Sequence, residues 1–368
     1  MGAPLDRAAE LEAAIADAPD EPGPYLVYAD WLQAIGDPRG TLIVLQHHGR
    51  EREASELIEE HRAHLLGPLA AAAAATAAGG EARRGAGPRK LELGWHLGFI
   101  REARIGWWAV GGAEVRREAA AALAALLALP SSRFLRHLTI ESVPFVRGDR
   151  DLGPFLDAVA AAGQARPLLL RSLFIGQDAS PWTIGPIAGV LGACPELRHL
   201  TLRAGELSLG AIAHPQLRAF GIEGHRLTRQ NVAELRAATW PRLEQLELSF
   251  HSRDLPIGCD ARDLAALFDG DNLPSLRHLG VLACPSADDV VRALAESRLL
   301  RRLSTLDLSG GALSHAGVAA MARSRLSFSH LARLELVHNR LDAAARAVAR
   351  GLARHVHVGP QEPPDAAA

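Results

Sequence analysis

The sequence is poor in net charge, lysine and cysteine. Its 40 basic residues, of which only Lys90 is a lysine, nearly balance 42 acidic residues and leave a formal net charge of −2. Nucleic-acid binders and proteins of acidic membrane surfaces normally carry a large basic excess. The balance therefore counts against both classes, although local basic patches are compatible with it.

The three cysteines, Cys194, Cys259 and Cys284, are too few and too widely spaced for a disulfide framework or a zinc knuckle. We therefore expect reduced thiols and a cytoplasmic protein. Residues 1–6 lack the basic start and apolar run of a signal peptide. The alanine run at 70–78 is too weakly apolar for a transmembrane helix, so no membrane association is expected.

The sequence motifs of common enzyme classes are also missing. It contains no G-x-x-x-x-G-K-[ST] phosphate loop, no G-x-G-x-x-G, no G-x-S-x-G and no H-E-x-x-H. Cys194 and Cys284 each precede a proline, where a small buried apolar residue is a better interpretation than a catalytic thiol. We accordingly expect no catalysis, no cofactor and no small-molecule substrate.

What the sequence does contain is a repeat. Its clearest copy, LARLELVHN at residues 331–339, follows the pattern L-x-x-L-x-L-x-x-N. The alternating leucines suit a short strand, and Asn339 stands where the chain turns away and can satisfy backbone groups. Such a unit has one buried edge and no core of its own, so it must stack on copies of itself.

Eight copies are present, and all 24 of their core positions hold Leu, Ile, Val or Phe. These positions are Leu135, Leu138, Ile140; Leu170, Leu173, Ile175; Leu197, Leu200, Leu202; Leu217, Phe220, Ile222; Leu243, Leu246, Leu248; Leu276, Leu279, Val281; Leu303, Leu306, Leu308; and Leu331, Leu334, Leu336. Between them the sequence predicts helices at 114–129, 184–192, 229–238, 261–268, 287–297, 314–322 and 342–352. The units resemble ribonuclease-inhibitor-like leucine-rich repeats, which implies an α/β solenoid with a parallel inner sheet and outer helices.

Unequal spacing predicts irregular connections. The step from Leu200 to Phe220 has no room for a helix and should cross by a turn or 3₁₀ segment at 205–215. Longer steps should carry loops at 144–153 and 252–260. A last strand is expected at 355–358, followed by a disordered tail at 359–368.

The N-terminal residues 1–66 predict a small all-α module with helices at 5–18, 25–35 and 38–66. The stretches PYLVYADWL at 24–32 and GDPRG at 36–40 resemble the short bacterial repeat-companion domain found beside leucine-rich repeats. LIVLQ at 42–46 departs from the charge pattern that this domain often has there. The resemblance implies no chemistry; Trp31 should pack between helices, and Asp30 and Asp37 should cap or brace a turn.

Residues 67–88 are rich in Ala, Gly and Arg and predict a linker. The solenoid should then occupy 89–358 and begin with a hairpin cap at about 89–110, in which Trp95, Phe99, Trp107 and Trp108 cover the first repeat. An aromatic ligand cage is the alternative for these side chains. The histidines at 47, 48, 61 and 64 could suggest a metal site, but solvent-facing side chains are the better interpretation because converging ligands are missing.

Polar residues between the buried positions should line the inner face and contact a partner. An arginine precedes position three in five repeats, and acidic residues follow in later repeats, which predicts a surface graded from basic to acidic. The candidate partner-binding residues are His137, His199, Arg203, Glu223, Glu247, His278, Asp307, Arg333 and Glu335.

These features favour a non-catalytic scaffold or adaptor for an unidentified protein partner. Leucine-rich-repeat activators of small GTPases suggest the alternative of a regulator of a partner enzyme, by analogy of fold alone. Nucleic-acid binding through the arginines is a third hypothesis, which the near-neutral charge disfavours.

Overall fold

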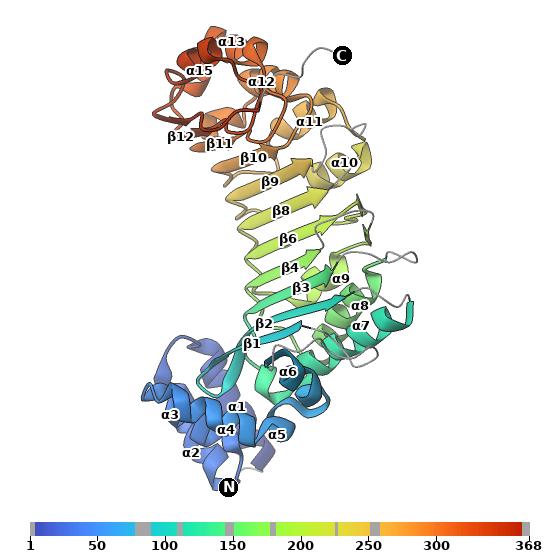
Figure 1. Ribbon diagram of the computed structural model, residues 1–368, viewed down its shortest axis with the longest axis vertical. Coiled ribbons are helices and arrows are strands. Elements are labelled where there is room, and N and C mark those ends of the chain that lie inside the picture. Colours follow the sequence, from blue (N-terminus) through green and yellow to red (C-terminus); the bar gives the residue numbers. More distant parts are fainter. Residues whose placement is uncertain are drawn as a thin grey trace. The chain divides into compact units, whose positions relative to one another are not determined.

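The computed structural model describes residues 4–77, 90–108, 113–143, 151–176, 182–224, 227–250 and 258–362 (Figure 1). The chain forms two compact units. The first unit comprises Met1–Asp149, Pro154–Leu173 and Gly192–Glu196, and the second comprises Arg150–Gly153, Phe174–Leu191 and Leu197–Ala368.

The first unit begins with short helices, and the first three of them share one aromatic core. They are α1 (Pro4–Asp17), α2 (Pro22–Ala34), α3 (Pro38–His47), α4 (Glu51–Glu60), α5 (Arg62–Leu66), the 3₁₀ turn η1 (Gly67–Leu69) and α6 (Ala70–Ala77). Ile15, Tyr25, Tyr28 and Leu32 are buried together, and Trp31 stacks on Tyr28 with ring centroids 5.6 Å apart. The helical module that the sequence predicts is therefore present.

Two sequence-based expectations fail in this region. The predicted helix at 38–66 is broken because Gly49 adopts a left-handed φ of 67°. The Arg50 and Gly49 amides donate to the Leu45 and Gln46 carbonyls, which closes α3 with a Schellman motif. Residues 67–77 of the predicted linker form η1 and α6, because alanine is the strongest helix former. The rest of that predicted linker, 78–88, lies outside the described residues.

The predicted hairpin is confirmed as β1 (Lys90–His96) and β2 (Phe99–Trp108), which pair antiparallel. Its turn residues Leu97 and Gly98 have positive φ values of 44° and 79°. Phe99 lies in the aromatic core, with its ring centroid 4.7 Å from that of Phe134. Trp95 is half-buried, whereas the side chains of Trp107 and Trp108 lie outside the described residues.

The first unit continues with α7 (Ala113–Ala128), the 3₁₀ turn η2 (Pro130–Ser132), β3 (His137–Val143), α8 (Gly153–Ala165) and β4 (Ser172–Gly176), whose first two residues belong to it. Its strands lie in the order β1-β2-β3-β4, and β2 and β3 are parallel. No helix was predicted at 153–165. Phe155, Leu156 and Val159, which α8 buries, are the apolar signal that could have indicated it. Most of the expected loop at 144–153 lies outside the described residues.

The second unit is a succession of parallel strands and covering helices. Its elements are β5 (Thr183–Ile184), α9 (Ala188–Ala193), β6 (His199–Ala204), β7 (Glu206–Leu207), β8 (Ala219–Gly224), α10 (Arg229–Ala237), β9 (Gln245–Phe250), α11 (Ala261–Phe268), β10 (His278–Leu282), α12 (Ala287–Glu296), the 3₁₀ turn η3 (Leu300–Arg302), β11 (Thr305–Asp307), α13 (His315–Arg323), α14 (Arg325–Phe328), β12 (Arg333–Glu335), α15 (Ala343–Ala349) and β13 (His355–His357). Its strands lie in the order β4-β6-β8-β9-β10-β11-β12-β13. Figure 1 shows α10, α11 and α12 along one side of these strands.

The predicted repeat core is confirmed. All 24 core positions are at most 3% exposed. In register, Leu246 of β9 pairs with Leu279 of β10, which pairs with Leu306 of β11. Each fully buried Leu contributes about 1.5–3 kcal/mol of gross hydrophobic stabilisation. The fold is therefore an α/β leucine-rich-repeat solenoid with an N-terminal helical module.

The irregular connections differ from expectation in detail. Ile184, predicted as the first residue of a helix, instead ends β5, which pairs with β7 in a separate two-stranded parallel sheet; the helix begins at Ala188. The short step between Leu200 and Phe220 is extended at β7 rather than a 3₁₀ turn, because Ser208 and Glu206 donate backbone hydrogen bonds to residues 184 and 182. Most of the expected loop at 252–260 lies outside the described residues.

The end of the array is anchored. Strand β13 pairs with β12, which confirms the expected last strand. The predicted tail is ordered up to residue 362, because the Gln361 amide nitrogen donates to the Leu336 carbonyl at 2.8 Å and the Glu362 backbone amide donates to Asn339. Asn339 is fully buried; its Nδ2 donates to the Leu308 carbonyl at 2.9 Å, and its Oδ1 accepts from the Leu313 amide at 3.1 Å. Residues 363–368 lie outside the described part of the chain.

Candidate interaction surface

One face of the sheet in the second unit carries exposed polar side chains. Along β9, Gln245 and Glu247 are exposed, whereas Leu246 and Leu248 between them are buried. This alternation places leucines against the helices and polar residues on the other side. We call this second side the open face; it consists of His199, Thr201, Arg203, Ala219, Gly221, Glu223, Gln245, Glu247, His278, Gly280, Thr305, Asp307, Arg333, Glu335, His355 and His357.

Ion pairs connect neighbouring strands on the open face. Arg203 of β6 and Glu223 of β8 are partners in the strand register and form an ion pair. The Arg203 guanidinium also lies 5.3 Å from the centroid of the Phe174 ring, within cation–π distance. Because both charged side chains are about 27–29% exposed, the pair remains accessible to a partner.

A second pair lines a shallow cavity of about 320 Å³. His278 Nε2 of β10 lies 3.3 Å from Glu247 Oε1 of β9. The hydrogen bond from His278 lowers the pKa of Glu247. Gln245, Arg277 and Thr305 line the same cavity, together with Glu244 and Ser304. The cavity therefore offers hydrogen-bond donors and acceptors of both charges.

The last two strands form a third group around Glu335. This carboxylate is paired with Arg333 on its own strand and accepts a hydrogen bond from His357 Nδ1 of β13 at 2.8 Å. Burial raises the pKa of Glu335, but the hydrogen bonds from Arg333 and His357 outweigh it and hold the pKa below its usual value. These three residues line a cavity of about 330 Å³ with His355 and Val356.

The structure brings together six of the nine candidate residues in pairs: Arg203 with Glu223, Glu247 with His278, and Arg333 with Glu335. His199 is exposed on β6, and Asp307 accepts a hydrogen bond from the Ser309 amide at 2.8 Å. His137 is exposed on β3 and belongs to the first unit, whereas the other eight candidates belong to the second. Sequence reasoning missed His357, although it stands in the expected last strand at 355–358, where the register places it opposite Glu335.

The expected basic half of the surface is only partly available: of its five arginines, Arg136 is fully buried and Arg171 is held by Asp20, whereas Arg198, Arg218 and Arg277 remain exposed. Arg218 pairs with Glu244, and Arg277 donates to the Leu276 carbonyl at 3.0 Å. The feature that recurs at this position is a backbone hydrogen-bond pattern. In the described part of the chain, six carbonyls there each accept two amides of the next strand: those of Arg136, Arg198, Arg218, Glu244, Arg277 and Ser304.

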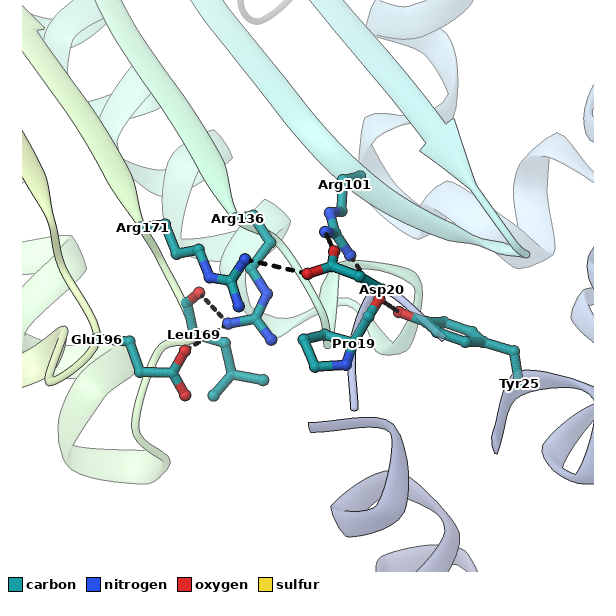
Figure 2. Close-up of polar contacts among 8 residues, drawn as sticks. All are labelled: Pro19, Asp20, Tyr25, Arg101, Arg136, Leu169, Arg171 and Glu196. Carbon is teal, nitrogen blue, oxygen red and sulfur yellow. Dashed lines mark hydrogen bonds and ion pairs between the residues drawn. The ribbon is translucent and has the colours of Figure 1, made fainter. Parts of the chain in front are cut away.

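In the first unit, arginines fix the loop that joins α1 to α2. Figure 2 shows Arg101 and Arg171 converging on Asp20, with Arg171 Nη1 3.4 Å from Asp20 Oδ2. The Pro19 carbonyl accepts hydrogen bonds from Arg101 Nη1 at 2.9 Å and from the Tyr25 hydroxyl at 3.0 Å. The hydrogen bond from Arg101 is the main cause of the lowered pKa of Asp20. Three long side chains of the first unit thus hold this loop.

Arg136 lies beside this cluster (Figure 2). Its Nη1 donates to the Leu169 carbonyl at 2.9 Å and to Glu196 Oε2 at 2.7 Å. Burial lowers the pKa of Arg136, and the Glu196 carboxylate beside the guanidinium opposes this shift. The side chain therefore braces the first repeats from inside and is not available to a partner.

The cysteines and the N-terminal histidines are the remaining candidates for catalysis or metal binding. Burial raises the pKa of the Cys194 and Cys259 thiols to about 12. His47 and His48 have ring centroids 5.1 Å apart, and His64 Nε2 lies 3.7 Å from Asp37 Oδ2. Within the described residues, no three His, Cys, Asp or Glu side chains are close enough to share a metal ion. No described helix is long and apolar enough to cross a bilayer.

No family model and no curated protein matches the chain. Among solved structures, a Bacteroides fragilis protein from a structural-genomics consortium is 23% identical with a TM-score of 0.57, and the match covers 65% of this chain and 68% of that one. The TLR13–ssRNA13 complex matches at 17% identity and a TM-score of 0.35 over 67% of this chain and 30% of that one. The mouse RP105/MD-1 complex matches at 13% identity and a TM-score of 0.29, over 70% of this chain and 50% of that one. The first match concerns the fold alone, and the other two superpose too loosely to support more.

Proposed function

We propose that the chain is a non-catalytic scaffold that binds a protein partner through the open face, and that its N-terminal helices are a repeat-companion module. The observation that carries the proposal is the open face itself. Its strands are buried on the helix side, whereas His199, Gln245, Glu247 and Arg333 remain exposed on the other. Leucine-rich repeats commonly use such extended surfaces for binding proteins.

The energetics support this assignment. Ion pairs at exposed sites contribute only about 0–1 kcal/mol each to folding. The pairs Arg203–Glu223 and Glu247–His278 therefore add little that the leucine core does not already provide. Charged groups of this kind instead affect the rate and register of association with a complementary protein.

The test changes the open face without disturbing the fold. Charge reversal at Asp307 would break its hydrogen bond from the Ser309 amide, and reversal at Glu335 would break its hydrogen bond from His357. A loss of binding by these variants could therefore reflect lost stability. Gln245→Lys with Glu247→Lys alters two exposed side chains of β9; it removes the Glu247–His278 pair, which at such an exposed site contributes only about 0–1 kcal/mol to folding. The control, Asp289→Lys with Glu296→Lys, places two lysines on exposed positions of α12 and adds four positive charges, one more than the β9 variant, so charge alone cannot explain a loss confined to β9.

The full-length variants are used to capture partners from the native organism, with quantitative mass spectrometry as the readout. We expect the β9 variant to recover at least tenfold less of the specific partner, equivalent to about 1.4 kcal/mol, at an unchanged melting temperature. The α12 variant should recover as much as the parent chain. Equal recovery by the parent chain and the β9 variant would refute the proposal.

A further inference from the structure

A third cavity, of about 440 Å³, lies within the first unit between the α1–α2 loop and the β1–β2 hairpin. Its lining consists of Asp20, Gly94, Trp95, His96, Arg101 and Glu102. Its volume is within the range of small-ligand sites. None of these residues is among the candidate partner-binding residues on the repeats.

The hairpin is locally irregular where it lines this cavity. The β1–β2 register shifts between Gly94 and Trp95, so that Gly94 pairs with Glu102 and Trp95 pairs with Ile100. Such bulges re-aim the side chains beside them. A Cβ on Gly94 would lie 3.2 Å from the Glu102 Cβ, so glycine keeps the space above Glu102 open. Trp95 remains half-buried at the cavity wall.

Of the two carboxylates that line the cavity, Asp20 has cationic partners and Glu102, in the part of the chain that the structure describes, has none. Asp20 is compensated by Arg101 and Arg171, and the Arg101 donors serve Asp20 and the Pro19 carbonyl. An anion entering the cavity would therefore compete with Asp20. Burial lowers the pKa of His96, which favours its neutral form.

Glu102, by contrast, has no cationic partner within the described residues. The arginine two positions along the strand, Arg104, already forms ion pairs with two other carboxylates, those of Glu92 at 3.7 Å and Glu141 at 3.1 Å. Glu102 is exposed, and its register partner on β3 is His137. The unmatched charge of this surface is therefore negative and stands beside an indole.

We propose that this cavity binds a basic side chain, arginine or lysine, of the protein partner. The cation would form an ion pair with Glu102 and a cation–π contact with Trp95. The inference rests on the proposed function and names the chemistry of the partner. A basic protein segment is the expected occupant, because the Glu102 carboxylate, which has no cationic partner among the residues that the structure describes, and the Trp95 ring both attract a cation.

The experiment measures fluorescence anisotropy of labelled hexa-arginine, hexa-lysine and hexa-glutamate peptides with the full-length chain at constant salt. We expect the basic peptides to bind and hexa-glutamate not to bind. Glu102→Gln and Trp95→Leu should each weaken binding by about 5- to 30-fold, equivalent to about 1–2 kcal/mol. Glu141→Gln removes a carboxylate nearby on β3 that does not line the cavity, and should change affinity less than twofold.

Thermal melts confirm that the variants fold, and Glu102 is exposed, so its substitution should not affect folding. Equal weakening by Glu102→Gln and Glu141→Gln would show attraction to the general surface charge and would overturn the inference. Preference for hexa-glutamate, or absence of binding by the basic peptides, would also overturn it. These outcomes leave the β9 and α12 capture experiment unaffected, so failure of the cavity and failure of the scaffold function are distinguishable.

Discussion

Asn339→Ala should destabilise the second unit far more than its size suggests. The side chain is fully buried and joins the Leu308 carbonyl, at 2.9 Å, to the Leu313 amide, at 3.1 Å. Truncation leaves both backbone groups without this partner, at about 1–3 kcal/mol each, so we expect a loss of about 2–6 kcal/mol. For a unit of this size each kcal/mol lowers the melting temperature by about 2–4 °C.

The assay is urea unfolding followed by circular dichroism, with amide exchange at Leu313 as a local probe. Asn272→Ala is the matched control, because Asn272 Nδ2 also donates to two carbonyls, those of Leu235 at 2.8 Å and Ala238 at 3.2 Å. Asn272 is only half-buried, so water can replace it and the expected loss is about 1 kcal/mol. A loss below about 0.5 kcal/mol for Asn339→Ala would refute the assignment of its hydrogen bonds as structural.

Three further predictions concern other elements. Gly98→Ala should cost at least about 1–2 kcal/mol, because φ is 79° and the new Cβ would lie 2.9 Å from the Arg39 carbonyl oxygen, whereas Gly23→Ala, with open space around it, should cost nothing in the same urea titration. Because the folded pKa of Asp20 is lowered, its stabilising contribution is complete above the unfolded pKa of about 3.9 and is lost as pH falls through the folded value; Asp20→Asn should therefore reduce the acid sensitivity of the urea midpoint below about pH 5, and an unchanged pH profile would contradict this. With thiol pKa values of about 12, Cys194 and Cys259 should not react with Ellman's reagent at pH 8 until the chain is unfolded in urea, and rapid reaction of the native protein would show that they are accessible.

The repeat core was predictable because burial acts on each copy in the same way. Leu334 and Leu306 occupy equivalent places on neighbouring strands, and the hydrophobic period reveals them without knowledge of the contacts. Asn339 was predictable for the same reason, since the backbone groups at a strand end need partners wherever the unit occurs. The break after α3 is a local event that depends on the left-handed conformation of Gly49, and the apolar period conceals it.

The surface was less predictable, because its charges meet across strands or across long chain separations. Arg171 and Asp20 are 151 positions apart, and nothing in either local pattern indicates that they meet. The sequence showed an arginine row but could not show that Arg136 is buried. Glu247 meets His278 diagonally, since His278 lies opposite Gln245 and Glu247 lies opposite Gly280 in the register, which the repeat spacing gave only approximately.

Carboxylate footprinting of the captured complex tests the central claim most directly. Glu247, exposed on the open face, and Glu296, exposed on α12, are activated with a carbodiimide and coupled to glycine ethyl ester in the free chain and in the complex. The account predicts that the partner slows modification of Glu247 by at least fivefold and leaves Glu296 unchanged. Protection of Glu296 with unaltered modification of Glu247 would contradict it and would place the partner on the helices.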